Sequence, residues 1–373
     1  MINTNVMLEK IGNVLELQRG YDLPTDKRIP GDIPIISSSG YTGYHNAYKC
    51  DGENVVTGRY GTIGEVYYHN GRCWPLNTSL FVKDFKGNNP RYIYYFLKNA
   101  LCLYKVSGSD KSTVPGIDRK VIHDMRVPFY KDIYYQSALC DVLGSIDKKI
   151  RCNQIILIEL ESMSKTLYDY WFVQFDFPDE NGNPYRSSGG KMVWNEQLKR
   201  EIPKRWNVTN IGNLTTVVTG KEDANFSSPN GKYKFFTCSQ ETLLCDTPAF
   251  SGQAVLIAGN GDFNVKHYSG EFNAYQRTYV LIPENQVYYG AMYISAKNQI
   301  QAFKNGSNGS IVKFITKGDV ENIPFILPND DSIFHQINKL IEKIELCERE
   351  NEELTKFRDW LLPMLMNGQA RVE

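Results

Sequence analysis

The stretch ALCDVLGSIDKKIRCNQIILIELESMSKTLYDYWF, residues 138–172, repeats an apolar side chain every three or four residues. Asn153 and Ser164 are the polar members of this ladder, whose positions are 139, 143, 146, 150, 153, 157, 160, 164, 167 and 171. Heptad spacing of this kind predicts a long helix that pairs with another helix in a coiled coil.

A second ladder follows at 333, 337, 340, 344, 347, 351, 354, 358, 361 and 365, and Asn351 interrupts it. An Asn on the seam of a coiled coil commonly fixes its register at a cost in stability, so we expect Asn153 and Asn351 to take part in helix pairing. The alternative is that each helix packs separately on its own domain. A helix of about 40 residues is about 60 Å long, which exceeds the width of such a domain and favours pairing.

The segments before the two ladders repeat one another at an offset of 200 residues. Ile11-Gly12-Asn13 returns as Ile211-Gly212-Asn213, Gly20 as Gly220, Gly52 as Gly252, and Val127-Pro128 as Leu327-Pro328. Gly108-Ser109 returns as Gly306-Ser307, two residues short of that offset. The shared order and near-constant spacing predict a duplicated unit, a globular domain followed by a long helix.

Each globular half contains short runs of Val, Ile, Tyr, Phe and Thr that are bounded by Gly, Asn and Pro. We expect strands of a twisted mixed sheet at 54–57, 64–68 and 78–82, and again at 254–258, 264–268 and 277–282. Helices are expected at 90–104 and 288–304. The predicted fold class is α+β, with two tandem globular domains separated by a long antiparallel two-helix coiled coil and related by pseudo-twofold symmetry.

This organisation predicts five regions along the chain. They are a first globular domain at 1–130, a first long helix at 131–172, a central linker at 173–206, a second globular domain at 207–329, and a second long helix with a tail at 330–373.

Length and composition are those of a soluble protein with two domains. The chain has 373 residues, of which 42% are hydrophobic, and no apolar run approaches the roughly 20 residues of a membrane span. Its first 20 residues lack the pattern of a signal peptide, so we expect a cytoplasmic protein without membrane contact. The eight cysteines form no Cys-x-x-Cys pair and no histidine completes a zinc site, which predicts reduced thiols and no metal.

The formal net charge is zero, with 42 basic and 42 acidic residues, but the charges are segregated. Residues 1–130 hold 16 Lys and Arg against 12 Asp and Glu, a net of +4, whereas 207–329 balance at 9 against 9. Residues 330–366 hold 5 against 9, a net of −4. A nucleic-acid surface is therefore expected on the globular parts rather than on the last helix.

The central linker contains the most specific strings of the chain, WFV at 171–173, YRSSGGKMVWNE at 185–196 and REIPKRW at 200–206. These strings resemble the central conserved region of the specificity subunits of type I restriction-modification systems. GENVVTGRYGTIG at 52–64 and GSDKSTVPGIDRKVIHDMRVP at 108–128 are also similar to segments of that family. The resemblance spans essentially the whole chain.

The resemblance implies two target recognition domains, 1–130 and 207–329, which each bind one half of a bipartite asymmetric site on double-stranded DNA. It implies that the two helices set the spacer between the half-sites and dock two methyltransferase subunits, which supply adenine-N6 methylation with S-adenosylmethionine. Restriction subunits would add the motor and the nuclease. This chain would then be a non-catalytic subunit without a cofactor of its own.

The second half departs from the family pattern. SGQAVLIAGNGDF at 251–263 keeps the glycines but has Asn260 and its neighbours where the first half has Arg59-Tyr60. Individual contacts therefore cannot be copied from one half to the other.

Motifs of catalysis are incomplete in this chain. Asn89-Pro90-Arg91-Tyr92 lacks the second Pro of the Asn-Pro-Pro-Tyr loop of adenine methyltransferases, and we interpret it as the start of a helix. Gly259-Asn260-Gly261-Asp262 misses the Gly-x-Gly-x-x-Gly pattern because position 264 is Asn, so a tight turn is expected. Glu222 follows Gly220-Lys221 where a phosphate-binding loop needs Ser or Thr.

Side chains suited to reading DNA lie in predicted loops of both halves, because base edges in the major groove are bound by Arg, Lys, Asn, Gln and short hydroxyl side chains. The candidates of the first half are Ser37, Ser38, Ser39, Tyr41, Tyr44, Arg59, Tyr60, Thr62, Lys111, Ser112 and Thr113. Those of the second half are Thr237, Ser239, Gln240, Asn260, Asp262, Lys266, Arg277, Asn305, Ser307, Asn308 and Ser310. Any one of them could instead be a solvated turn residue.

Aromatic residues make up 13% of the chain, and most are expected in the core. The cluster Tyr168, Tyr170, Trp171 and Phe172 is expected to anchor the end of the first long helix to the linker or the second domain.

The alternative function is a protein-interaction scaffold without DNA binding, whose duplicated domains bind peptides and whose helices dimerise. The zero net charge is its main support. Salt-sensitive binding to duplex DNA separates the two hypotheses.

Overall fold

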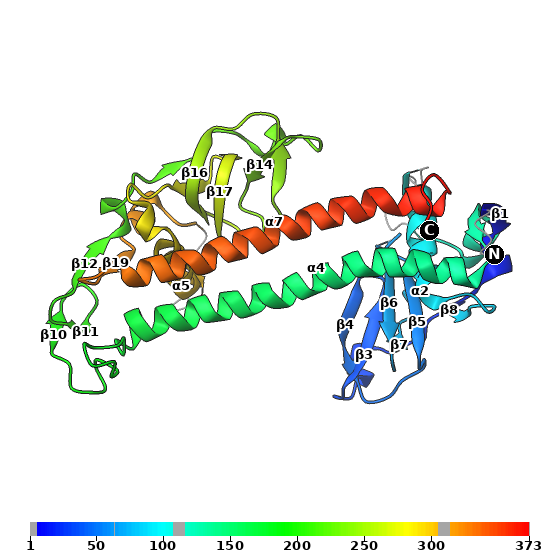
Figure 1. Cartoon of the computed structure of the whole chain (residues 1–373), viewed down its shortest axis with the longest axis horizontal. Coiled ribbons are helices and arrows are strands. Elements are labelled where there is room, and N and C mark those ends of the chain that lie inside the picture. Colours follow the sequence, from blue (N-terminus) through cyan, green and yellow to red (C-terminus); the bar gives the residue numbers. More distant parts are fainter. Residues whose placement is uncertain (1–5, 63, 107–115, 305–313, 373) are drawn as a thin grey trace. The chain divides into compact units, whose positions relative to one another are not determined.

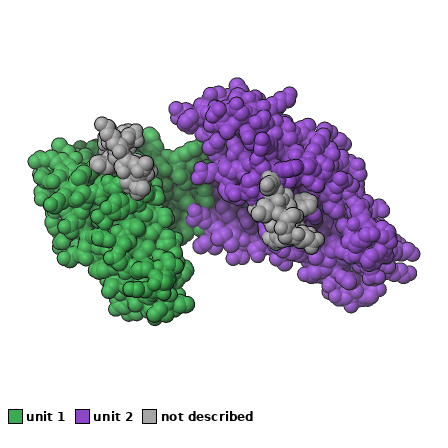
Figure 2. All heavy atoms as spheres, turned by 180° about the vertical axis from the view of Figure 1, so that it is seen from behind, with its two compact units in different colours: residues 1–152, 351–373 green, residues 153–350 purple. Residues whose placement is uncertain are grey.

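The computed structural model describes residues 6–62, 64–106, 116–304 and 314–372, which form runs of short strands, several short helices and two long helices (Figure 1). The chain divides into two compact units (Figure 2). Unit 1 consists of Met1–Cys152 and Asn351–Glu373, and unit 2 is Asn153–Glu350. The mixture of strands and helices confirms the predicted α+β class.

Unit 1 is built around a four-stranded antiparallel sheet in the order β2-β8-β5-β6 and a three-stranded sheet in the order β4-β3-β7. Strands β1 and β9 pair separately, and α2 packs against β5 and β6. The strands are β1 (Val6–Lys10), β2 (Glu16–Arg19), β3 (Ile33–Ser37), β4 (Gly40–His45), β5 (Glu53–Gly58), β6 (Val66–Asn70), β7 (Trp74–Pro75), β8 (Ser79–Asp84) and β9 (Arg126–Tyr130). The helices are α1 (Ile11–Val14), α2 (Pro90–Val106), α3 (Arg119–Asp124), the first part of α4 (Ile133–Tyr168) and the last part of α7 (Ser332–Met366).

Unit 2 contains one six-stranded mixed sheet in the order β13-β18-β16-β17-β14-β15, and α5 packs against β16 and β17. Its strands are β10 (Met192–Asn195), β11 (Arg200–Pro203), β12 (Asn207–Asn210), β13 (Val218–Thr219), β14 (Tyr233–Phe236), β15 (Leu243–Cys245), β16 (Phe250–Ala258), β17 (Val265–Ala274), β18 (Thr278–Leu281) and β19 (Pro324–Leu327). Its helices are the last part of α4, α5 (Tyr289–Lys304), α6 (Lys317–Glu321) and the first part of α7 (Ser332–Met366). The six predicted strands and both predicted short helices are confirmed, with bounds that differ by a few residues.

The two units share one topology. Each unit contains one parallel pair of strands beside its antiparallel pairs. In unit 1, β3 is parallel to β7, and in unit 2, β14 is parallel to β17. Strand β17 is ten residues long and pairs with both β16 and β14, whereas the matching segment of unit 1 is divided into β6 and β7. The sheet of unit 2 is therefore continuous where that of unit 1 is divided.

Repeated glycines mark places where backbones approach closely. A Cβ atom at Gly20 would lie 2.1 Å from the carbonyl oxygen of Leu76, and one at Gly220 would lie 1.8 Å from that of Ala274. Both distances are far shorter than any real Cβ contact, so each position requires glycine. The amide of Ile11 donates to the carbonyl of Met125 and that of Ile211 to the carbonyl of Ile323, which repeats the backbone contacts as well.

Helix α2 begins where the sequence predicted a helix start. Pro90 is its first residue, and the side chain of Asn89 accepts hydrogen bonds from the amides of Arg91 and Tyr92 at 2.9 and 3.3 Å. This combination of an Asn cap and a Pro in the first position is typical of helix N-termini.

The ladder positions of both long helices are buried or half-buried, and in each unit a segment of α4 joins the same hydrophobic core as a segment of α7. Leu139, Leu143 and Leu365 belong to the core of unit 1, and Leu160 and Ile344 to that of unit 2. The same cores contain residues of the sheets and the short helices, so the ladders also pack on the globular parts. In each unit, ladder residues of the two long helices therefore share a core with residues of the globular part.

Two polar contacts join α4 to α7. In unit 1 the guanidinium of Arg358 donates to the carboxylate of Asp147 at 2.9 Å, and the hydroxyl of Tyr95 donates to the same carboxylate. In unit 2 the amide nitrogen of Asn153 donates to the carboxylate of Glu350 at 2.6 Å. The side-chain oxygen of Asn351 is buried and has no hydrogen-bond partner among the described residues.

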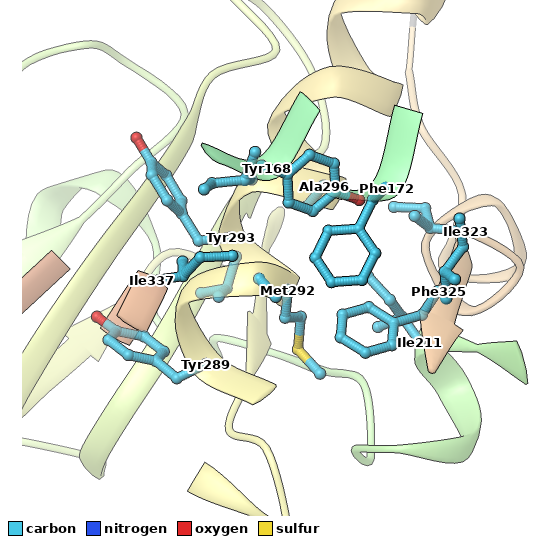
Figure 3. Close-up of a cluster of buried hydrophobic side chains, with 14 of the residues drawn as sticks. Tyr168, Phe172, Ile211, Tyr289, Met292, Tyr293, Ala296, Ile323, Phe325 and Ile337 are labelled. Atoms are coloured by element: carbon cyan, nitrogen blue, oxygen red, sulfur yellow. The ribbon is translucent and has the colours of Figure 1, made fainter. Parts of the chain in front are cut away.

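The aromatic cluster at the end of α4 anchors the helix in unit 2, as expected. Tyr168 and Phe172 are 8% and 1% exposed, and the ring of Phe172 lies 5.7 Å from the rings of both Trp206 and Phe334. Figure 3 shows Tyr168 and Phe172 in one cluster with Met292, Ala296 and Phe325. The linker residue Trp206 also stacks on Trp171.

None of the described helices is long and apolar enough to cross a membrane. All eight cysteines are free, and six of them are buried or half-buried. Within the described parts of the chain, no group of three His, Cys, Asp or Glu residues could hold a metal ion.

Replacing Phe172 by Ala should lower the unfolding free energy of unit 2 by about 3–5 kcal/mol, because a fully buried ring leaves a cavity. Denaturant unfolding followed by circular dichroism measures the change. Trp194→Ala is the control, since Trp194 is 57% exposed, and we expect a change of about 0.5 kcal/mol or less. Equal losses from the two substitutions would contradict this role of the cluster.

Candidate functional site

Four segments of unit 1 meet at the turn that follows β5. The amides of Arg59 and Tyr60 donate to the carbonyl of Thr78 at 2.9 and 3.3 Å, and the amide of Ile117 donates to the carbonyl of Arg59 at 2.9 Å. A Cβ atom at Gly58 would lie 2.0 Å from the carbonyl oxygen of Thr62 and 3.3 Å from that of Ser38. The turn between β3 and β4, the turn after β5, the start of β8 and the segment at 116–117 therefore form one loop cluster.

The matching segments of unit 2 meet in the same way. The amide of Gly259 donates to the carbonyl of Arg277 at 2.9 Å, and the amide of Ile315 donates to the carbonyl of Gly259 at 2.8 Å. The thiol of Cys238, from the turn after β14, donates to the carbonyl of Arg277 at 3.3 Å. Asn260 forms an isolated bridge with Phe314, as Tyr60 does with Gly116. The two loop clusters are thus equivalent at offsets of 198 to 200 residues.

Several predicted residues of unit 1 lie in its loop cluster. Ser39, Tyr60 and Thr62 are exposed, and Ser38 and Arg59 are half-buried. Ser37 is buried and shapes the turn, because its hydroxyl donates to the carbonyl of Gly40 and lies 3.0 Å from the hydroxyl of Ser39.

Tyr41 and Tyr44 follow that turn on β4, and both are exposed. The hydroxyl of Tyr41 contacts the ring of His69 at 3.3 Å. Tyr44 pairs with Pro34, at the end of the hairpin away from the turn, so the fold does not bring it to the loop cluster.

Arg59 has a defined position in the cluster. Its guanidinium lies over the ring of Tyr60, 4.6 Å from the centroid, which is a cation–π contact. No ion pair of Arg59 is found among the described residues, so its charge is not neutralised by any of them.

In unit 2 the predicted residues form a surface of mixed charge. Ser239, Gln240, Asp262 and Arg277 are exposed, and Thr237, Asn260 and Lys266 are half-buried. Gly261 and Phe263 both have positive φ, 70° and 46°, so the expected tight turn at 259–262 is confirmed. This surface offers the guanidinium of Arg277 together with amide, hydroxyl and carboxylate groups, where unit 1 offers Arg59 and Tyr60.

Seven of the predicted residues lie outside the described parts of the chain. They are Lys111, Ser112, Thr113, Asn305, Ser307, Asn308 and Ser310.

Two side chains that the sequence did not single out donate hydrogen bonds to the backbone of the turns at 38 and 238. Asn264 is 8% exposed and donates to the carbonyl of Cys238 at 2.8 Å, and Tyr67 donates to the carbonyl of Ser38 at 3.5 Å. Burial raises the pKa of Tyr67. Asn264 stands where the Gly-x-Gly-x-x-Gly pattern that begins at Gly259 would need its last glycine. This departure was the one signal in the sequence that pointed to Asn264.

Comparison with known proteins agrees with the duplicated architecture. The family described as "Type I restriction modification DNA specificity domain" matches the chain twice, at residues 3–162 and 203–356. The chain is similar to the "Type I restriction enzyme EcoDI specificity subunit" of Escherichia coli, with 34% identity over 180 residues. That alignment covers 46% of this chain and 40% of the relative, so it spans less than half of the length of either protein.

A second relative matches over almost the full length. The "Type I restriction enzyme MjaIX specificity subunit" of Methanocaldococcus jannaschii is 23% identical over 395 aligned positions, which cover 92% of this chain and 88% of the relative. Among solved structures, the S subunit of a type I restriction-modification system from M. genitalium has the same fold, with a TM-score of 0.63 and 16% identity. That match covers 97% of this chain and 96% of the other.

The family matches account for both halves of the chain, and the alignment with the second relative extends across both of them. The chain therefore belongs to the type I restriction modification DNA specificity domain family, as a specificity subunit with two copies of that domain.

Proposed function

We propose that the chain reads a bipartite, asymmetric site on double-stranded DNA and catalyses no reaction itself. One observation supports this most strongly: the same four segments converge in both units, but they present different side chains. Equivalent scaffolds with different exposed groups suit two reading sites that recognise two different sequences.

The chemistry of the two loop clusters supports different half-sites. Arg59 in unit 1 has a charged planar fork suited to the O6 and N7 acceptors of guanine, and its stacking on Tyr60 restricts its motion. Unit 2 also exposes a guanidinium, that of Arg277, but its Gln240 and Asn260 add the amide groups that pair with adenine. Asp262 could accept a hydrogen bond from the amino group of cytosine.

The two long helices act in this proposal as an antiparallel coiled coil with pseudo-twofold symmetry, which sets the spacer between the half-sites. The order of the contacts supports it, because Asp147 contacts Arg358 in one unit and the later residue Asn153 contacts the earlier residue Glu350 in the other. Helix α4 has 36 residues and α7 has 35. At about 1.5 Å per residue, each is about 50 Å long.

We also propose that the helices dock two methyltransferase subunits, in a complex that includes restriction subunits. Ile158 on α4 is 67% exposed, and Phe357 and Trp360 on α7 are 48% and 57% exposed and stack on each other. Large apolar groups exposed on a helix suit a protein partner. The methyltransferase subunits would bind S-adenosylmethionine and methylate adenine at N6. Such a complex would work on DNA in the cytoplasm, where free thiols like those of this chain stay reduced.

The main test uses the full chain purified alone and with its cognate methyltransferase subunit. We expect binding to duplex DNA that weakens steeply with salt, because Lys and Arg contacts to phosphates release counterions. Mapping of methylated adenines should then give one motif with two different halves and a fixed spacer. Absence of salt-sensitive DNA binding in both preparations would favour the protein-interaction scaffold instead.

The spacer prediction is tested by lengthening both helices together. One heptad inserted after Cys152 and one after Glu350 would keep the ladder in register and lengthen the helix pair by about 10 Å. We expect both half-site sequences to stay the same and the spacer to grow by about three base pairs, at about 3.4 Å each.

The matched control for the spacer test inserts the heptad after Cys152 only. This change shifts α4 against α7, so we expect the complex to lose methylation rather than gain a new spacer. If the double insertion altered either half-site sequence, the helices could not be acting only to set the spacer length.

A further inference from the structure

The turn at 237–240 of unit 2 is held by side chains that come from the neighbouring strand. The side chain of Asn264 donates to the carbonyl of Cys238, and the ammonium of Lys266 donates to the carbonyl of Ser239, both at 2.8 Å. Asn264 and Lys266 are two residues apart at the start of β17, so they extend from the same side of the strand. The carbonyls of the consecutive residues Cys238 and Ser239 are therefore each bound by one of these two side chains.

Further side-chain contacts complete the turn. The hydroxyl of Thr237 lies 3.1 Å from that of Ser239, which donates to the carbonyl of Glu241 at 2.9 Å. The thiol of Cys238 points to the carbonyl of Arg277. These bonds leave Ser239 and Gln240 exposed on the outside while the inner carbonyls are satisfied.

Lys266 differs from a lysine that reaches for a phosphate group. Its ammonium donates inward to the turn and lies 5.8 Å from the centre of the Phe236 ring. Lys266 is half-buried, and this burial lowers its pKa. A lysine in this position supplies a hydrogen bond to the protein more readily than a free charge to DNA.

Unit 1 supports the equivalent carbonyl with a different residue. The carbonyl of Ser38, 200 positions before Cys238, accepts from the hydroxyl of Tyr67. The ring of Tyr67 also lies under Gly40, where a Cβ atom would come within 3.1 Å of it. Both units thus support the same point of the turn, although the supporting residues are not equivalent in sequence.

We infer that Asn264 and Lys266 are positioning residues that hold the 237–240 turn so that Ser239 and Gln240 present fixed polar groups to the bases of the second half-site. This inference rests on the proposed DNA-reading function. Sequence analysis placed Lys266 among the residues that touch DNA, and the inference gives it a different role. The sequence read by unit 2 would depend on these two side chains although neither contacts a base.

The test compares methylation by the complete complex on its wild-type site and on sites with single base changes in either half. Asn264→Ala and Lys266→Met each remove one donor to the turn. We expect discrimination against base changes in the second half-site to fall by about tenfold, since one good base contact contributes that order of selectivity. Discrimination in the first half-site should not change, and Lys266→Arg should restore it in the second because it keeps a donor.

Thr215→Val is the matched structural control. Thr215 is 2% exposed and donates to the carbonyl of Ile282 at 2.7 Å, away from the turn, so this variant loses a comparable buried hydrogen bond of unit 2. We expect a lower unfolding midpoint without loss of discrimination in either half-site. If Asn264→Ala fails to fold, Lys266→Met alone decides the test, because its side chain is only half-buried and keeps its apolar stem.

Three outcomes separate the possibilities. Unchanged discrimination in folded Lys266→Met would overturn the inference. Weaker binding to all sequences, with a salt dependence reduced by about one counterion, would also overturn it, because Lys266 would then contact a phosphate. A wild-type complex with no bipartite preference would reject the proposed function itself, which this design detects before any variant is compared.

Discussion

Burial of the two apolar ladders is the constraint on which both units depend. Leu139 and Leu143 of α4 complete the core of unit 1 together with Leu365 of α7, and Leu160 and Ile344 do the same in unit 2. Each core thus contains a segment of each long helix, and Leu139, Leu143 and Ile344 are at most 1% exposed. Buried apolar surface stabilises the contacts between α4 and α7. The hydrogen bonds of Arg358 with Asp147 and of Asn153 with Glu350 make these contacts more specific.

The duplicated segments of the two units keep the same backbone geometry, while their exposed side chains differ. Gly20 and Gly220 stay glycine because a carbonyl oxygen occupies the place of a Cβ atom. By contrast, Arg59 and Gly259 occupy matching places and have nothing in common except the backbone hydrogen bonds of their turns. A reading surface made of such turns can change its chemistry without changing the sheet beneath it, which is what two different half-sites require.

The parts of the fold that depend on local spacing could be predicted from the sequence. The ladders on α4 and α7, the capped start of α2 at Pro90 and the duplicated strands all leave a pattern within a few residues. The continuous sheet of unit 2 leaves no such pattern, because it depends on β17 being long enough to reach β14. The support of the turns by Asn264 and Tyr67 was also missed, since a side chain's partner 26 or 29 residues away follows only from tertiary packing. The identity of the DNA contacts stays a prediction.

The central claim is that each unit carries its own reading site on a shared scaffold. The most direct measurement replaces residues 211–328 by a second copy of residues 11–128, which exchanges one unit's globular part for the other's at the repeated Ile-Gly-Asn and Pro positions. Methylated sites of the resulting complex would then be mapped. The account predicts a motif in which the first half-site sequence occurs in both halves and the second is lost. A motif that keeps its original second half would contradict it.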